Sequence, residues 1–385
     1  MDFGAVFVAT CLATAIATLI MGLSANYPIA LAPGMGQNAF FAYGIVLGMG
    51  HNWQTALGAV FISGLLFILI SLLPIREKII NSIPTSLKIG ITAGIGFFLV
   101  IISLKGSNII ISQEATLLTL GDLTSIPALL IIGGFIVITG LTARRIKGAV
   151  IIGILLATFI GWLTGITEFK GVVSLPPSMA PIFLQMDVSS ALNSSMITII
   201  LTLLLVDVFD TTGTLIGVGK QANLLDKDGR LTRLRNALLA DSSATAIGAV
   251  LGTSSTTSYI ESAAGVQAGG RTGLTSVATA LLFVLCLIFA PLAQTIPAFA
   301  TGATLLFVGS LMAQSLKELN WDDITESAPA MITALMMPLS YSIANGLGIG
   351  FICYVGIKII SGKANQCSLM LYLIAMIFLL KFLFL

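Results

Sequence analysis

The chain has 385 residues, of which 57% are hydrophobic and only 9% are charged, and its formal net charge is +2. Its mean hydropathy is +1.05, and its apolar runs of about 20 residues match the hydrocarbon core of a bilayer, which excludes a soluble globular protein. The sequence therefore predicts an all-α polytopic membrane protein.

The apolar runs predict membrane segments along the whole chain. The first run begins at Phe3 and lacks a basic leader and a small-residue cleavage site, so it is interpreted as a retained span and not as a signal peptide. The predicted segments are 4–22, 29–47, 53–73, 86–104, 123–141, 147–166, 191–217, 233–252, 255–269, 273–294, 297–315, 326–341, 343–361 and 366–385.

Basic residues are concentrated in alternate loops, and the opposite loops carry little besides Lys105 and Lys170. The positive-inside rule predicts that the basic loops are cytoplasmic, which puts the amino terminus outside and the loop Gly219–Leu231 inside. Because orientation accounts for these charges, no nucleic-acid partner is expected. The basic set is Arg76, Lys78, Lys88, Arg144, Arg145, Lys147, Lys220, Lys227, Arg230, Arg233, Arg235, Lys358 and Lys363.

Two predicted segments do not read as ordinary lipid-facing helices. The stretch "NYPIALAPGMGQNAFFAYG" contains Pro28, Pro33 and Gly34, so its first half is expected to be extended and a helix is expected to begin near Gly36. The stretch "TSSTTSYIESAAGVQAGGRTG" has the same design, with Glu261 between a Ser/Thr-rich part and small residues. Extended backbone at membrane depth is tolerated only where protein or a polar cavity surrounds it.

Apolar spans flank each of these segments, and the charge pattern gives the two units opposite orientation in the membrane. Interrupted spans at corresponding places in two halves indicate a transporter site at the meeting of an inverted repeat. Half-helix amino termini there would offer amides and partial positive charge to a polar ligand.

Carboxylates inside the membrane are the next signal, because each costs at least about 2.5 to 3.5 kcal/mol to insert. Asp207 and Asp210 lie three residues apart on one predicted helix, and Thr211 to Gly213 are expected to loosen it. We predict functional roles for Asp210 and Glu261. For Asp207, pairing with a basic loop residue or capping of a neighbouring helix is the simpler interpretation, and Asp241 is either a buried hydrogen-bond partner or a relay residue.

Asn38 is the polar residue of the first interrupted segment that corresponds to Glu261. An amide offers both donors and an acceptor, whereas an ionised carboxylate offers acceptors only, so the two together suit a planar heterocycle. A buried Asn can also serve as a helix–helix hydrogen bond. Catalytic signatures such as GxSxG or HExxH are absent from the sequence, and the four cysteines have no metal-ligand spacing, so we expect no enzyme, no metal and no cofactor.

The motifs "ALAPGMGQNAFFAYG", "DVFDTTGTLIGVG" and "GTSSTTSYIESAAGVQAGGRTGLT" resemble the nucleobase transporters of the NCS2 group, in its AzgA-like branch of adenine, guanine and hypoxanthine permeases. The resemblance runs from about residue 2 to the carboxyl end. It implies a core-and-gate fold of 7+7 inverted repeats, like uracil permease, in the inner (plasma) membrane. It also implies proton-coupled symport of purine nucleobases, with a homodimer as a candidate assembly in the lipid bilayer.

Carried over motif by motif, the resemblance assigns substrate binding to Asn38, Asp210 and Glu261, and proton coupling to the two carboxylates. Thr214, one turn beyond Asp210, is expected to face the same site by helical spacing. Residues 1–361 are then one transporter domain, made of an incomplete first repeat, 1–166, and a second repeat, 191–361. Residues 362–385 form an additional hydrophobic helix.

One departure from the resemblance matters, because relatives have a hydrophobic helix before the segment that begins here at Met1. A truncated, transport-inactive family member is therefore one alternative. An anion carrier of the related sulfate-permease architecture is another, although it would require a basic residue at the half-helix ends, where this chain has Asp210 and Glu261.

Overall fold

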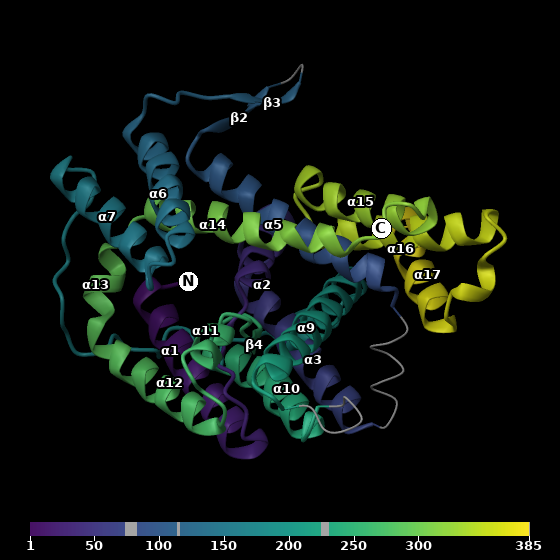
Figure 1. Ribbon diagram of the computed structural model, residues 1–385, viewed down its shortest axis with the longest axis horizontal. Helices are drawn as coiled ribbons and strands as arrows, with labels where there is room; N and C mark the ends of the chain where they lie inside the picture. The colour runs from purple at the N-terminus through teal and green to yellow at the C-terminus, as the bar shows by residue number, and fades with distance from the viewer. Residues whose placement is uncertain (74–82, 114–115, 225–230, 385) are drawn as a thin grey trace. The chain divides into compact units, whose positions relative to one another are not determined.

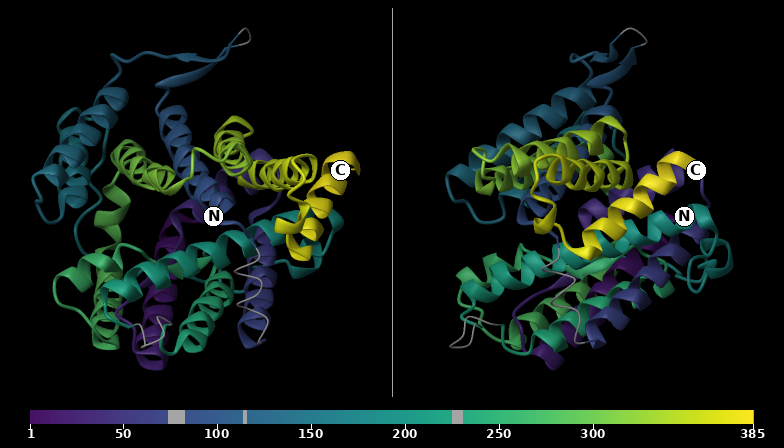
Figure 2. Two further views of the ribbon diagram at one scale, coloured as in Figure 1. Left: turned by 45° about the vertical axis from the view of Figure 1, so that its right-hand side comes forward. Right: turned by 90° about the vertical axis from the view of Figure 1, so that its right-hand side faces the viewer.

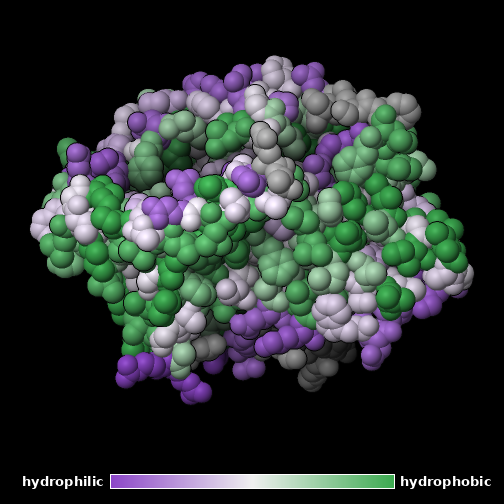
Figure 3. Space-filling model, turned by 90° about the horizontal axis from the view of Figure 1, so that it is seen from above, coloured by the Kyte–Doolittle hydropathy of each residue, from purple (hydrophilic) through white to green (hydrophobic). Residues whose placement is uncertain are grey.

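A computed structural model describes residues 1–73, 83–113, 116–224 and 231–384 (Figure 1). The basic residues Arg76, Lys78, Lys227 and Arg230, which contribute to the predicted orientation, lie outside the described residues. Within the described part of the chain, eight helices are long and apolar enough to cross a membrane. Apolar side chains cover much of the face seen in Figure 3, as expected for helices that meet lipid.

The chain divides into two compact units, each drawn from both halves of the sequence. Unit 1 comprises Met1–Pro84, Leu175–Ala290 and Lys358–Leu385, and unit 2 comprises Thr85–Ser174 and Pro291–Ile357. The terminal helix of residues 362–385 thus packs as part of unit 1. The division into repeats 1–166 and 191–361 stays a prediction.

Unit 1 contains both interrupted segments. Its elements are α1 (Phe3–Ile20), η1 (Met21–Ala25), β1 (Leu31–Pro33), α2 (Met35–Ala39), η2 (Phe40–Gly48), α3 (Trp53–Leu72), α8 (Val188–Ala191), α9 (Ser194–Gln221), α10 (Leu234–Leu251), β4 (Thr256–Ser258), α11 (Ser262–Gln267), α12 (Gly273–Cys286), η3 (Leu287–Phe289), η5 (Ala364–Gln366) and α17 (Leu369–Phe384).

Helix packing in unit 1 relies on close backbone approach. Helix α1 packs against α10 and α12, and α10 packs against α3, so that these four helices run side by side (Figure 2). A Cβ atom added to Gly22 would lie 2.7 Å from the carbonyl oxygen of Gly273, so glycine is required where η1 meets α12. Small residues at such contacts are how membrane helices gain van der Waals packing.

Unit 2 is built around α5, which packs against α14 and α15. A hairpin, β2–β3, follows α5, and the sequence analysis did not predict it. The elements are α5 (Thr85–Gly106), β2 (Ile110–Gln113), β3 (Leu117–Leu120), α6 (Ile126–Ala143), α7 (Ala149–Leu163), α13 (Ala290–Thr295), α14 (Ala298–Ala313), η4 (Gln314–Glu318), α15 (Ile324–Leu339) and α16 (Ile343–Ile360).

The predicted break in the first segment is confirmed, since β1 is extended and α2 begins at Met35. The break near Glu261 is confirmed as well, since β4 is extended and α11 begins at Ser262. Thr211 to Gly213 do not break α9, which continues to Gln221. The Thr212 hydroxyl donates to the carbonyl oxygen of Val208 at 2.6 Å, a contact that bends a helix locally without ending it.

Candidate transport site

The two extended segments pair with each other inside unit 1. Strands β1 and β4 are antiparallel, with Leu31 opposite Ser258 and Pro33 opposite Thr256. The pairing continues beyond the strands, because the amide of Gly34 donates to the carbonyl of Ser255 at 3.0 Å. This crossing satisfies backbone groups that no helix serves, which is the condition for extended backbone at membrane depth.

Side chains of α1 complete the crossing. The hydroxyl of Thr18 donates to the carbonyl of Leu31 at 3.0 Å and accepts from the amide of the same residue at 2.9 Å. All three residues of β4 are buried, including Thr256 and Thr257. The crossing is therefore a packed part of unit 1, and polar residues on either side of it are held by a rigid support.

Three of the predicted site residues are exposed beside this crossing. Asn38 comes from α2, Asp210 from α9 and Glu261 from the residue that caps α11. Helix α9 packs against both β4 and α11, which brings Asp210 toward Glu261. Polar atoms that remain exposed among membrane-spanning helices are available to a ligand.

The amide of Asn38 is oriented by neighbours on both sides. Its Oδ1 atom accepts a hydrogen bond from the hydroxyl of Ser254, and its Nδ2 atom lies 3.4 Å from the carbonyl oxygen of Pro33. Ser254 is itself buried, just before β4. Because the acceptor oxygen is occupied, the NH₂ group is the part of Asn38 best placed to meet a ligand.

Thr214 lies one turn beyond Asp210 on α9 but differs in its environment. Its side chain is buried, at 3% exposure, whereas Asp210 is exposed. The structure therefore brings Asn38, Asp210 and Glu261 to one exposed region and leaves Thr214 within the packed interior next to it. The predicted role of Thr214 in substrate binding stays a prediction.

Behind the exposed residues, Asp207 is fully buried at 0% exposure. Its Oδ1 atom accepts from Nε2 of Gln37 at 3.2 Å, and its Oδ2 atom accepts from the hydroxyl of Thr245 at 2.7 Å. Among the described residues, the partners of Asp207 are therefore the side chains of Gln37 and Thr245. Asp207 joins α9 to α2 and α10.

Asp241 of α10 is the second buried carboxylate. Its Oδ1 atom accepts from the amide of Ser258 at 2.7 Å and from the hydroxyl of the same residue at 2.5 Å. Its Oδ2 atom accepts from the hydroxyl of Thr211 at 2.5 Å, and Thr211 in turn lies 2.9 Å from the hydroxyl of Thr257. Asp241 is therefore a hydrogen-bond partner that ties α9 and α10 to β4.

Gln37 is the residue that sequence reasoning missed. It is adjacent to Asn38, yet its side chain is only 2% exposed and points to Asp207. Successive residues of a helix project about 100° apart, so two neighbouring polar residues can serve an inner and an outer layer. The signal in the sequence was a pair of amides in an otherwise apolar segment.

Among the described residues that form this region, no basic side chain neutralises the carboxylates of Asp210 and Glu261. The nearest cation along the chain, Arg271, donates to the carbonyl oxygens of Val266 and Gly270 at the far end of α11. Described residues also contain no group of three His, Cys, Asp or Glu side chains arranged to hold a metal ion. The arrangement can bind a neutral ligand through acceptors from Asp210 and Glu261 and a donor from Asn38.

Structural comparison shows the same fold in solved transporters. The transmembrane domain of the cyanobacterial bicarbonate transporter BicA matches with a TM-score of 0.65 and 18% identity, over 90% of this chain and 96% of that one. The anion transporter family member SLC26A9 matches with a TM-score of 0.62 and 12% identity, over 93% of this chain and 64% of that one. At such low identities the likeness concerns the fold alone.

Sequence comparison identifies the family. Residues 1–349 match the profile of the Permease family. A putative permease of Methanocaldococcus jannaschii is 51% identical over 100% of this chain and 88% of its own length. The guanine/hypoxanthine permease PbuG of Bacillus subtilis is 47% identical, over 100% of this chain and 88% of its own. The adenine permease AdeP of Escherichia coli is 44% identical, over 100% of this chain and 86% of its own length.

These matches confirm the resemblance to nucleobase transporters of the NCS2 group, although assignment to the AzgA-like branch stays a prediction. The chain therefore belongs to the permease family, and it is a multi-pass transport protein of the inner membrane and not an enzyme.

Proposed function

We propose that the chain carries purine nucleobases, namely adenine, guanine and/or hypoxanthine, into the cell together with protons. The names of the relatives AdeP and PbuG support the substrate class, at 44% and 47% identity over nearly the whole chain. A homodimer in the lipid bilayer stays a prediction.

The observation that carries the proposal is the separation of polar residues into two layers at the β1–β4 crossing. Asn38, Asp210 and Glu261 are exposed, whereas Gln37 and Asp207 are buried and bonded to each other. A purine presents donors and acceptors along one planar edge, which an amide and two carboxylates can match. The buried layer keeps the backbone of the exposed layer in place.

Proton coupling follows from the closeness of Asp210 and Glu261. Two neighbouring carboxylates resist simultaneous ionisation, so a site that contains both favours the uptake of a proton. A proton held there changes one group from an acceptor into a donor. Binding of proton and base can then depend on each other.

The test is uptake of labelled adenine by cells that express the chain, with each unlabelled purine as competitor. We expect concentrative uptake that an uncoupler abolishes and that a sodium gradient alone does not restore. Competition by one or more of adenine, guanine and hypoxanthine, and none by thymine or sulfate, is expected. Accumulation that survives the uncoupler would refute proton coupling but leave purine transport standing.

An anion carrier is the second candidate, because the solved structures with the same fold include a bicarbonate transporter, BicA, and an anion transporter, SLC26A9. The acidic residues Asp210 and Glu261 oppose it, since they would repel an anion. Uptake of labelled bicarbonate or sulfate without purine uptake would favour this candidate. Absence of any uptake from membranes with folded protein would favour the transport-inactive alternative.

A further inference from the structure

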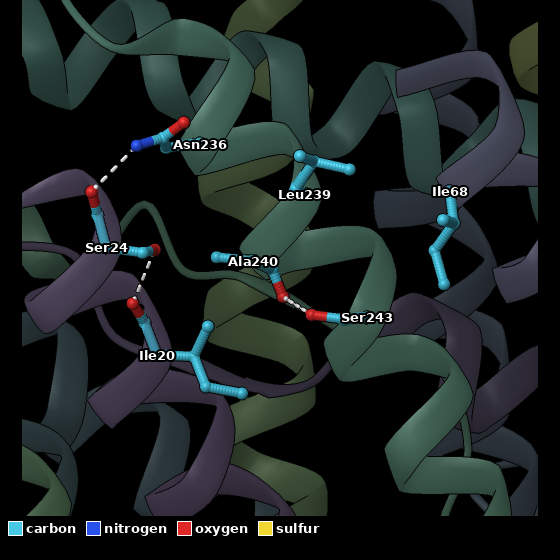
Figure 4. Close-up of a pocket in the computed structure, with 7 residues that line it drawn as sticks. All are labelled: Ile20, Ser24, Ile68, Asn236, Leu239, Ala240 and Ser243. Carbon is cyan, nitrogen blue, oxygen red and sulfur yellow. Dashed lines mark hydrogen bonds between the residues drawn. The ribbon is translucent and has the colours of Figure 1, made fainter. Parts of the chain in front are cut away.

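A groove opens on the surface of unit 1 (Figure 4). It has a volume of about 400 Å³ and lies between the end of α1, η1, α3 and the first half of α10. Ile20, Ile68 and Leu239 provide its apolar wall. None of the residues that line it belongs to the proposed transport site.

The two hydroxyl groups in the groove donate to carbonyls of their own helices, and the amide nitrogen of Asn236 donates across to η1. The hydroxyl of Ser24 donates to the carbonyl of Ile20 at 2.7 Å, and that of Ser243 donates to the carbonyl of Ala240 at 2.9 Å. Nδ2 of Asn236 donates to the carbonyl of Ser24 at 2.9 Å and links η1 to α10 (Figure 4). Such a wall suits hydrocarbon better than a polar solute, which would need free partners.

The surface on both sides of the groove is apolar and exposed. On η1, Leu23 is 71% exposed, and on α3, Leu65 and Leu72 are 46% and 47% exposed, one turn before and one turn after Ile68. Leucines exposed on membrane-spanning helices are expected to meet lipid chains, because hydrocarbon is their favourable surroundings in a bilayer. We therefore expect the groove to open to the bilayer.

Positive charge stands at one end of the groove. Arg233 immediately precedes α10 and Arg235 is the second residue of this helix; both are exposed and lie close in sequence to Asn236, which lines the groove. The charge distribution of the loops predicts that this end faces the cytoplasm. From Asn236 to Ser243 the groove runs about 10 Å along α10, which fits within the cytoplasmic half of a hydrocarbon core about 30 Å thick.

We propose that this groove binds an anionic phospholipid of the cytoplasmic leaflet, with one acyl chain along Ile20, Ile68 and Leu239 and the headgroup at Arg233 and Arg235. The apolar wall alone would accept any acyl chain. The two arginines select for an anionic headgroup, because a basic residue near an anionic lipid surface strengthens attraction about fivefold.

The test measures lipid retained by the purified full-length protein, using native mass spectrometry in detergent. Dioleoyl phosphatidylglycerol and dioleoyl phosphatidylcholine are compared because they share acyl chains and differ in charge. We expect the anionic lipid to bind about 25-fold more tightly, given two arginines at about fivefold each. The Arg233→Gln/Arg235→Gln variant should bind both lipids alike.

A matched control changes charge elsewhere. Arg144→Gln/Arg145→Gln removes two exposed arginines that follow α6, on the same predicted side of the membrane, and should keep the preference for the anionic lipid. Ser243→Leu should lower retention of both lipids, because the larger side chain fills the groove. If this variant does not fold, Ile68→Phe on the opposite wall makes the same test. Glycerol 3-phosphate, which has the headgroup chemistry without acyl chains, should not compete.

Equal retention of the two lipids by the unaltered chain would overturn the proposal, as would equal loss of preference in the Arg144/Arg145 control. Competition by glycerol 3-phosphate would indicate an anion site without an acyl chain. If neither groove-filling variant changed lipid retention, lipid would not occupy the groove. The same would follow if these variants changed the oligomeric state and not the retention of lipid.

Discussion

The hydroxyl of Ser254 donates a hydrogen bond to the side-chain oxygen of Asn38, joining two segments that are 216 residues apart in the sequence. Ser254 is buried and Asn38 is exposed. A buried residue of the second segment therefore fixes the direction in which the exposed amide of the first segment presents its donor.

Ser254→Ala is expected to weaken apparent purine affinity about 2- to 10-fold, because one intramolecular hydrogen bond contributes about 0.5 to 1.5 kcal/mol to the oriented state. Ser254→Thr should retain most of it. The neighbouring hydroxyl of Ser255 is buried and has no hydrogen-bond partner in the part of the chain that the structure describes, so Ser255→Ala is the matched control and should leave affinity unchanged. The measurement is the KM of labelled purine uptake, and equal effects of the two alanine variants would contradict the positioning role of Ser254.

Asn38 itself should contribute affinity without carrying charge. Asn38→Ala is expected to cost about 1 to 3 kcal/mol of purine binding, because a ligand group loses its partner in a site removed from bulk water. Asn38→Asp should change both affinity and the pH profile, because it places a third carboxylate beside Asp210 and Glu261. Uptake measured across a pH series checks both variants. Unchanged affinity in Asn38→Ala would leave Asn38 with a structural role only.

Glu261 combines an exposed carboxylate with a capping position at α11. Glu261→Gln keeps the size and one acceptor but cannot titrate, so we expect loss of proton-driven accumulation with purine exchange retained. Glu261→Ala should lose binding as well. Accumulation and exchange are compared in membranes that contain matched amounts of folded protein. If Glu261→Gln still accumulated purine with the normal pH dependence, Asp210 would be the remaining candidate for proton coupling.

The extended segments could be predicted because their signals are local. Pro28, Pro33 and Gly34 exclude regular helix in the first segment whatever surrounds it. The antiparallel register of β1 and β4 could not be predicted, since it depends on packing between residues more than 220 positions apart, such as Leu31 and Ser258. Local patterns do not contain the spatial order of such long-range pairs.

The division of polar residues into exposed and buried groups was predicted only in part. The sequence favoured a functional role for Asp210 and a structural role for Asp207, but it did not indicate that Asp207 is bonded to Gln37 while Asp210 is exposed. The difference depends on which side of α9 meets α2 and α10. The cost of inserting a carboxylate indicated that each needs a reason, but only the packing shows which reason applies.

Asp241 and Asp210 should therefore differ in what they support. Asp241→Ala would leave the amide and hydroxyl of Ser258 and the hydroxyl of Thr211 without their acceptors, at about 1 to 3 kcal/mol for each buried group. We expect a lower thermal midpoint and less folded protein. Asp210→Ala removes an exposed carboxylate and should abolish purine accumulation with the midpoint unchanged. The measurement is the thermal midpoint of both purified variants. An Asp241→Ala protein as stable as the unaltered chain would show that the buried network is not needed for the fold.

The contact between η1 and α12 should tolerate no side chain at either glycine. A Cβ atom on Gly273 would lie 2.0 Å from the carbonyl oxygen of Gly22, and a backbone atom cannot move aside as the end of a flexible side chain can. Gly273→Ala and Gly22→Ala should both lower the thermal midpoint and reduce uptake in proportion to the loss of folded protein. Gly217→Ala in α9 is the control, because among the described residues no atom beyond its chain neighbours and the backbone of its own helix lies within 4 Å of the added Cβ, and alanine favours helix by about 1 kcal/mol. A Gly273→Ala protein as stable as Gly217→Ala would show that the two backbones are not in close contact.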